Sequence, residues 1–151
     1  MGPSVITVLM GAPGAGKSTW VHKNKSPGSH IYNTEAVRTN PGIDVQAFMR
    51  YERVKAIEAA KSGLDVICDG THTLAGHRLV WLTVARTLMV DTKLILFDTP
   101  LICLLSAQKE RLHPAPHKVV VDHYRRFEMQ KQLVRREAWG SIEVIVRGID
   151  A

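Results

Sequence analysis

A glycine-rich segment near the N-terminus has the residue types and the spacing of a phosphate-binding loop. Residues 11–18 match the pattern G-x-x-x-x-G-K-[ST] at every fixed position. Glycine lets the backbone curve around a phosphate with its N–H groups pointing inward, where a Cβ atom would obstruct it. We predict that Lys17 contacts the β- and γ-phosphates and that the Ser18 hydroxyl is a ligand of Mg²⁺. The predicted nucleotide-binding segment comprises Gly11, Ala12, Pro13, Gly14, Ala15, Gly16, Lys17, Ser18 and Thr19.

A carboxylate and a guanidinium follow the second apolar segment of the chain. Glu35 and Arg38 are three residues apart in Asn-Thr-Glu-Ala-Val-Arg, so on a helical turn they share a face. A kinase needs a carboxylate that accepts the proton of the acceptor hydroxyl, and cations that neutralise the transferring phosphate. We therefore predict that Glu35 is the general base and that Arg38 holds the acceptor. The alternative interpretation is a local ion pair on the surface.

A further carboxylate follows the third apolar segment, in Asp69-Gly70-Thr71. Mg²⁺ prefers oxygen ligands and keeps several water molecules when it binds beside phosphates. We predict that Asp69 contacts the metal, through water if not directly, or orients the acceptor. The alternative is that Asp69 only caps the loop that follows it.

Short apolar runs alternate with segments of helical periodicity along the chain. Strands are expected at residues 5–10, 30–33, 64–68, 93–97 and 142–146. Helices are expected at residues 18–25, 44–61, 76–90, 101–111 and 117–137, with a helical turn at 35–38. This alternation predicts an α/β fold of three layers, a parallel five-stranded sheet with helices on both faces, as in P-loop NTPases and nucleotide kinases. Ligands of such sheets collect at the carboxyl ends of the strands, so Glu35 and Arg38 are expected beside the glycine-rich loop.

The length and composition are those of one globular domain. We assign residues 1–151 to a single P-loop kinase domain, with a lid at about 111–118, where prolines interrupt the helices. Lys and Arg number 20 against 14 Asp and Glu, a formal net charge of +6 that attracts polyanions. No apolar run has the roughly 20 residues of a membrane span, so no membrane partner is expected. Cys68 and Cys103 are interpreted as buried thiols, which favours a cytoplasmic protein.

Two other classes of P-loop protein are disfavoured. The chain lacks an N-K-x-D motif, which argues against a GTPase, and 151 residues are too few for most motor ATPases. A small kinase is the class that fits best.

Several segments together resemble the kinase domain of the 5′-hydroxyl polynucleotide kinases, which phages and bacterial RNA-repair systems encode. They are VITVLMGAPGAGKSTW, YNTEAVR, VICDGTHTLAGHRLVW and the basic lid. The resemblance implies that Lys17 and Ser18 hold the triphosphate and Mg²⁺. It also implies that Glu35 stands at the general-base position, where the family usually has Asp, and that Arg38 contacts the acceptor phosphate.

The resemblance extends to further arginines. Arg78 and Trp81 reproduce an Arg-x-x-Trp spacing of the family, which makes Arg78 a candidate for acceptor binding. A lid arginine is also implied, and Arg111 is our choice, with Arg125 and Arg126 as alternatives.

The resulting hypothesis is transfer of the γ-phosphate of ATP, or of another nucleoside triphosphate, to the 5′-OH end of DNA or RNA. If the protein is phage-encoded, it would act in the host cytoplasm. One alternative is a kinase of another hydroxyl, carried by a nucleoside, a small molecule, a nucleotide-sugar or a hydroxymethylated base in DNA. An alternative of another class is a nucleotide-dependent binding module, in which Glu35 and Arg38 are surface residues.

Overall fold

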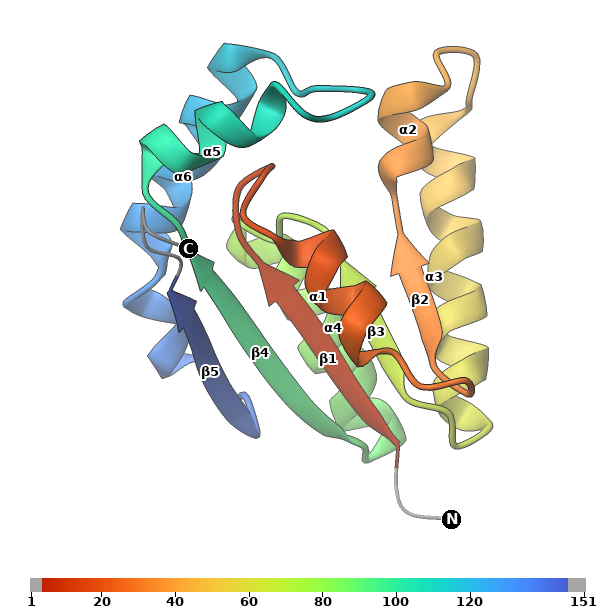
Figure 1. Ribbon diagram of the computed structural model, residues 1–151. Helices are drawn as coiled ribbons and strands as arrows, with labels where there is room; N and C mark the ends of the chain where they lie inside the picture. The colour runs from red at the N-terminus through yellow and green to blue at the C-terminus, as the bar shows by residue number, and fades with distance from the viewer. Residues whose placement is uncertain (1–3, 147–151) are drawn as a thin grey trace.

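A computed structural model describes residues 4–146 of the chain, apart from the side chain of Arg38. Its centre is a five-stranded sheet in the order β2-β3-β1-β4-β5, with every neighbouring pair parallel. The strands are β1 (Val5–Met10), β2 (His30–Asn33), β3 (Val66–Asp69), β4 (Asp91–Asp98) and β5 (Ser141–Val146). The predicted parallel five-stranded sheet is thus confirmed, and its strands all point to the same edge (Figure 1).

Strand β1 lies in the middle of the sheet because both of its faces are apolar. Side chains alternate across a strand, so Val8 and Met10 enter one core and Leu9 enters the other. All three are fully buried. A strand that reads as a continuous apolar run is the expected centre of a parallel sheet covered on both faces.

Helices cover both faces of the sheet, which completes the predicted three layers. Helices α3 (Val45–Lys61) and α4 (Ala75–Leu88) supply side chains to one core, and α1 (Lys17–Asn24) and α5 (Leu101–Gln108) supply the other. In Figure 1, α1 crosses in front of the strands and α4 lies behind them. Helix α6 (His117–Gln130) reaches both cores, through Val120 and Phe127.

The residues next to α3 explain where this helix begins and where it ends. The Asp44 carboxylate accepts a hydrogen bond of 3.1 Å from the Ala47 N–H, which caps the first turn. Gly63, just after the helix, has φ of +87°, a left-handed conformation that glycine adopts without strain. No helix in the described part of the chain combines the length and apolar character that crossing a bilayer requires.

The helix predicted at 117–137 is shorter in the structure. Helix α6 ends at Gln130, and a 3₁₀ turn, η1 (Leu133–Arg136), follows. In one continuous helix Gln130 and Glu137 would be separated by about 10.5 Å along the axis. Instead the Arg78 guanidinium binds both side chains, and the break in the helix brings them together.

Candidate active site

The glycine-rich loop has the backbone conformation that its sequence predicts. Gly14 and Gly16 have φ of +93° and +98°, in the region that favours glycine. A Cβ atom on Gly14 would lie 2.7 Å from Gln108 Nε2, and one on Gly11 would lie 2.9 Å from the Phe97 Cβ. Helix α1 begins at Lys17, so its free N–H groups and positive dipole end face the loop. The segment therefore has the shape of an anion cradle.

Lys17 lies inside this loop. Its side chain is buried, and Nζ donates hydrogen bonds to the carbonyl oxygens of Gly11 (2.7 Å) and Ala12 (2.9 Å). Burial lowers the pKa of the Lys17 ammonium to about 8, although the Asp69 carboxylate opposes this change. The ammonium is thus held where a phosphate bound in the loop would meet it.

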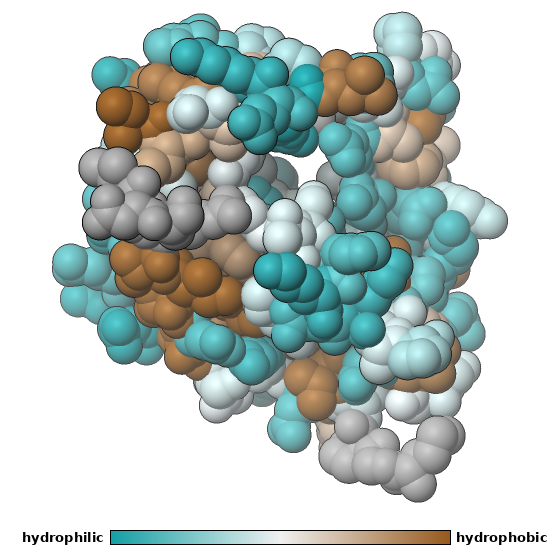
Figure 2. All heavy atoms as spheres, in the orientation of Figure 1, coloured by the Kyte–Doolittle hydropathy of each residue, from teal (hydrophilic) through white to brown (hydrophobic). Residues whose placement is uncertain are grey.

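A pocket of about 520 Å³ opens above the loop. It is lined by the glycine-rich loop, the start of α2 (Glu35–Thr39), the end of β3, helices α5 and α6, and the segment 109–116 between those two helices. Figure 2 shows a hollow between the α5–α6 side of the molecule and the α2 side, with a largely hydrophilic rim. The predicted residues that line this pocket are Pro13, Gly14, Gly16, Lys17, Ser18, Thr19, Glu35, Asp69 and Arg111.

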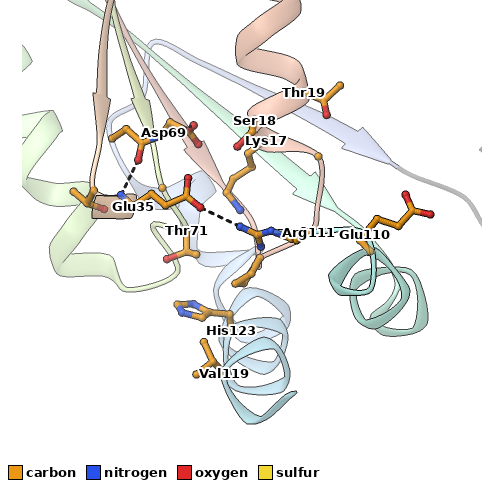
Figure 3. A pocket seen from close by; sticks show the side chains of 17 residues that line it. Lys17, Ser18, Thr19, Glu35, Asp69, Thr71, Glu110, Arg111, Val119 and His123 are labelled. Carbon is orange, nitrogen blue, oxygen red and sulfur yellow. Dashed lines mark hydrogen bonds and ion pairs between the residues drawn. The ribbon is translucent and has the colours of Figure 1, made fainter. Parts of the chain in front are cut away.

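The Asn33 side chain positions both carboxylates of the pocket. Its Oδ1 accepts a hydrogen bond of 2.7 Å from the Glu35 N–H, an Asx turn that starts α2. Its Nδ2 donates to Asp69 Oδ2 at 3.3 Å, since Asn33 and Asp69 are paired in the register of β2 and β3. Glu35 and Asp69 are therefore fixed on the same side of the pocket, facing Lys17 (Figure 3).

The oxygen atoms present fit a magnesium ion. Ser18 and Asp69 both line the pocket, and hydroxyl and carboxylate oxygens are ligands that Mg²⁺ accepts. Burial raises the pKa of Asp69, and the Lys17 ammonium opposes this change. Among the described residues no three His, Cys, Asp or Glu side chains gather into a metal site. An ion here would therefore take further ligands from phosphate and water.

Arg111 closes the pocket from the opposite side. It lies in the segment 109–116, between α5 and α6, which holds most of the predicted lid and is called the lid below. The Arg111 Nη2 is 3.4 Å from Glu35 Oε1. Figure 3 shows the two side chains pointing toward each other across the opening. Arg125 and Arg126, the other lid candidates, do not line this pocket. Arg126 instead contacts Thr73 and His123.

Sequence reasoning missed Gln108, which fastens the lid to the loop. Its Nε2 donates to the Pro13 carbonyl at 2.9 Å, and its Oε1 accepts from the Ala115 N–H at 2.9 Å. A single buried amide thus joins the glycine-rich loop to the lid. The signal in the sequence is a long polar side chain at the end of a mostly apolar helix, LICLLSAQ.

His123 was also not assigned to the site. It lines the pocket from α6, and its Nδ1 is 2.9 Å from Thr73 Oγ1. Burial, together with the nearby charge of Arg126, lowers the pKa of His123 to about 4. The imidazole is therefore neutral at physiological pH.

The structure places Arg78, predicted to bind the acceptor, outside the pocket. Its side chain is 0% exposed and does not line the pocket. The guanidinium donates to Glu137 at 3.0 and 2.8 Å, to Gln130 at 2.7 Å and to the His72 carbonyl at 3.0 Å. Burial of an arginine with its donors satisfied by these partners indicates a structural role.

Arg38 belongs to α2, but its side chain lies outside the described residues. Its contact with the acceptor stays a prediction from the sequence.

Solved structures of low sequence identity share this fold. The AvrRxo1-ORF1:-ORF2 complex with ATP matches with a TM-score of 0.78 and 12% identity, over 99% of this chain and 56% of that chain. The Pnkp1/Rnl/Hen1 RNA repair complex matches with a TM-score of 0.73 and 16% identity, over 88% and 47%. The deoxyadenosine kinase from M. mycoides with bound dATP matches with a TM-score of 0.54 and 16% identity, over 97% and 91%.

The chain thus spans about half the length of the first two of these proteins. The likeness shows a P-loop NTPase-like fold. None of the curated proteins matches the sequence significantly.

The AAA_33 family, described as an AAA domain, matches residues 6–136, which include the glycine-rich loop, both carboxylates and the lid. The chain therefore belongs to the AAA_33 family of P-loop domains.

Proposed function

We propose that this protein is a phosphotransferase that moves the γ-phosphate of ATP, or of another nucleoside triphosphate, to the 5′-OH end of DNA or RNA. The observation that carries the proposal is the convergence of Lys17, Glu35 and Arg111 on one pocket above the glycine-rich loop. A phosphate cradle alone would serve any P-loop protein. A carboxylate at the acceptor side and a cation from the opposite side are what a kinase adds.

The chemistry follows from these positions. Glu35 accepts the proton of the 5′-OH as its oxygen bonds to the γ-phosphorus, while the bond from that phosphorus to the β–γ bridging oxygen breaks and ADP leaves. Lys17 and Arg111 neutralise charge on the phosphoryl oxygens, and Arg38 holds the acceptor phosphate. Mg²⁺, held by Ser18 and by Asp69 through water, would neutralise charge on the β- and γ-oxygens. Catalysis here consists of positioning and electrostatics.

Other features support a polynucleotide acceptor. The net charge of +6 attracts polyanions. The segments around the glycine-rich loop, Glu35 and Arg38 resemble the polynucleotide kinases. The fold matches a chain of the Pnkp1/Rnl/Hen1 RNA repair complex, whose name refers to RNA.

The proposal is tested with an acceptor panel. The protein is incubated with γ-labelled ATP and Mg²⁺, and separately with each acceptor: nucleosides, and DNA or RNA oligonucleotides that carry either a 5′-OH or a 5′-phosphate. We expect label on the 5′-OH oligonucleotides and none on the 5′-phosphorylated ones. Label on a nucleoside, with none on any oligonucleotide, would instead favour a nucleoside kinase, the alternative that the match to the deoxyadenosine kinase supports.

A further inference from the structure

A second pocket, of about 430 Å³, adjoins the first and is lined by residues of α3 and α4. We call it the α3–α4 pocket. Thr34, Gly70 and Thr71 line both pockets, so the two meet at the carboxyl ends of β2 and β3. Thr34 directly precedes Glu35, the proposed base. A molecule whose hydroxyl lies at Glu35 therefore has the α3–α4 pocket beside it.

The inner part of this pocket is aromatic and apolar. Tyr32 and Trp81 both line it, and their rings pack edge to face with centroids 4.8 Å apart and an interplanar angle of 71°. Met49 and Val80 add apolar wall. Most of each aromatic side chain is buried in the core, so the rings form a rigid floor. A floor of this kind suits a flat body such as a nucleobase with its sugar.

Two arginines on α3 line the same pocket, Arg50 and Arg53. They are three residues apart, so they project from one face of the helix. Burial raises the pKa of Tyr32, and the charge of Arg53 opposes this change. The Arg53 guanidinium is therefore close enough to the floor of the pocket to act on it electrostatically.

The lining of the α3–α4 pocket offers these arginines no acidic partner. The α3–α4 pocket has no Asp or Glu among its lining residues, whereas the first pocket contains Glu35, Asp69 and Glu110. Within the described part of the chain, neither Arg50 nor Arg53 forms an ion pair. Their neighbour Glu52 pairs with Lys55 instead, at 3.1 Å. Two guanidinium groups beside an aromatic floor are the donor set of a phosphate site, since a guanidinium can bind phosphate oxygens in pairs.

We propose that the α3–α4 pocket is an acceptor subsite in which Arg50 and Arg53 bind a backbone phosphate of the acceptor strand. The adjoining nucleoside packs against Tyr32 and Trp81. This contact is additional to the acceptor phosphate predicted for Arg38. The identity of the acceptor rests on the function proposed above, whereas the anion subsite rests on the pocket itself. It follows that this chain selects an acceptor that carries its own negative charge, and that a neutral nucleoside binds weakly.

Direct binding tests the subsite without catalysis. Fluorescence anisotropy measures the Kd of a labelled 5′-OH tetrathymidylate in the absence of ATP, for the wild type and for the double variant Arg50→Gln/Arg53→Gln. The same oligonucleotide with an uncharged methylphosphonate backbone is the second probe. Arg86→Gln is the matched control, because Arg86 is exposed on α4 and lines neither pocket. Circular dichroism and ATP binding establish that each variant is folded.

We expect the double substitution to weaken binding of the phosphodiester probe at least tenfold and to leave the methylphosphonate probe unchanged. The slope of log Kd against log salt concentration should fall by about 1.4, which corresponds to two phosphate contacts on a single strand. The inference is overturned if the double variant binds the phosphodiester probe as the wild type does, or no more weakly than Arg86→Gln.

The kinase assay separates this inference from the proposed function. Transfer to 5′-OH oligonucleotides with an unchanged KM in the double variant would sustain the function and refute the subsite. Absence of any transfer to oligonucleotides would refute the function. Even if no transfer occurs, loss of phosphodiester binding in the double variant would still support a subsite that binds an anion.

Discussion

The Arg111 guanidinium lies 3.4 Å from the Glu35 carboxylate and joins the lid to the first turn of α2. The pair is partly exposed, with 30% of the Arg111 side chain and 47% of the Glu35 side chain accessible, so its net contribution to stability is small. A triphosphate carries more charge than one carboxylate and competes for the same guanidinium. The proposed base and the proposed lid cation are thus paired with each other in this structure, and nucleotide binding would redirect Arg111 toward the donor.

Removing the base should abolish transfer and spare nucleotide binding. We expect Glu35→Gln to lower kcat by about 100-fold or more, the usual effect of losing general-base catalysis, with an unchanged Kd for ATP. Glu110→Gln is the matched control, because Glu110 lines the same pocket but points away from Lys17 and Arg111 (Figure 3). Steady-state transfer rates and equilibrium dialysis with ATP measure the two effects. Equal rates in the Glu35→Gln and Glu110→Gln variants would exclude Glu35 as the base.

Lys17 is expected to matter for activity and little for folding. Lys17→Ala removes the cation inside the glycine-rich loop, so we predict a loss of transfer by several powers of ten. Lys23→Ala, an exposed lysine of the same helix, should transfer phosphate at the wild-type rate. Thermal unfolding checks that both variants fold. A folded Lys17→Ala protein with full activity would contradict the assignment of the loop.

Arg78 should prove to be a stability residue. Arg78→Ala leaves the Glu137 carboxylate, only 14% exposed, without its positively charged partner, and we expect the free energy of unfolding to fall by about 3 kcal/mol. Urea denaturation measures this loss. Where enough folded protein remains, its KM for the acceptor should be that of the wild type, because the side chain does not line the pocket. A raised acceptor KM with unchanged stability would restore the binding role predicted from the sequence.

Acid should destabilise the protein through His72. Burial lowers the pKa of this imidazole from 6.5 to about 4, so between those values the unfolded chain binds a proton that the native protein does not. The free energy of unfolding therefore falls as the pH drops from about 6.5 to 4, by about 3 kcal/mol from this group.

His72→Asn is the comparison for that prediction. In the native protein His72 Nδ1 donates to the Leu9 carbonyl at 2.8 Å, and the side-chain amide of the introduced Asn can donate in its place. Asn also tolerates the φ of +46° at this position. Urea unfolding of both proteins at pH 7 and pH 4.5 measures the difference. Equal losses of stability in the wild type and the variant would mean that His72 does not carry the effect.

The sequence predicted the structure correctly where a conformation depends on residues that are close together in the chain. The apolar run of β1 and the glycine spacing of residues 11–18 predict their own conformations, and Asp44 and Gly63 mark the ends of α3. The predicted positions of Glu35 and Asp69 followed from a general property of parallel sheets, that strands end at the same edge.

Contacts between distant segments could not be predicted in this way. The choice among lid arginines depends on how the segment 109–116 folds over the pocket, which Gln108 controls through bonds to Pro13 and Ala115. Arg78 has the spacing of a binding residue, yet its partners Gln130 and Glu137 are more than 50 residues away in the chain. These two partners lie on either side of the break that follows α6, although the apolar periodicity of the sequence would allow a longer helix.

Single-turnover partition of the labelled γ-phosphate tests the central claim most directly. Excess protein is mixed with γ-labelled ATP, Mg²⁺ and a 5′-OH oligonucleotide, and the label is divided between the oligonucleotide and inorganic phosphate. A kinase with Glu35 facing the acceptor should place most of the label on the 5′ end, and Glu35→Gln should abolish this product. Release of the label as inorganic phosphate, at a rate that neither the oligonucleotide nor Glu35→Gln changes, would contradict the account.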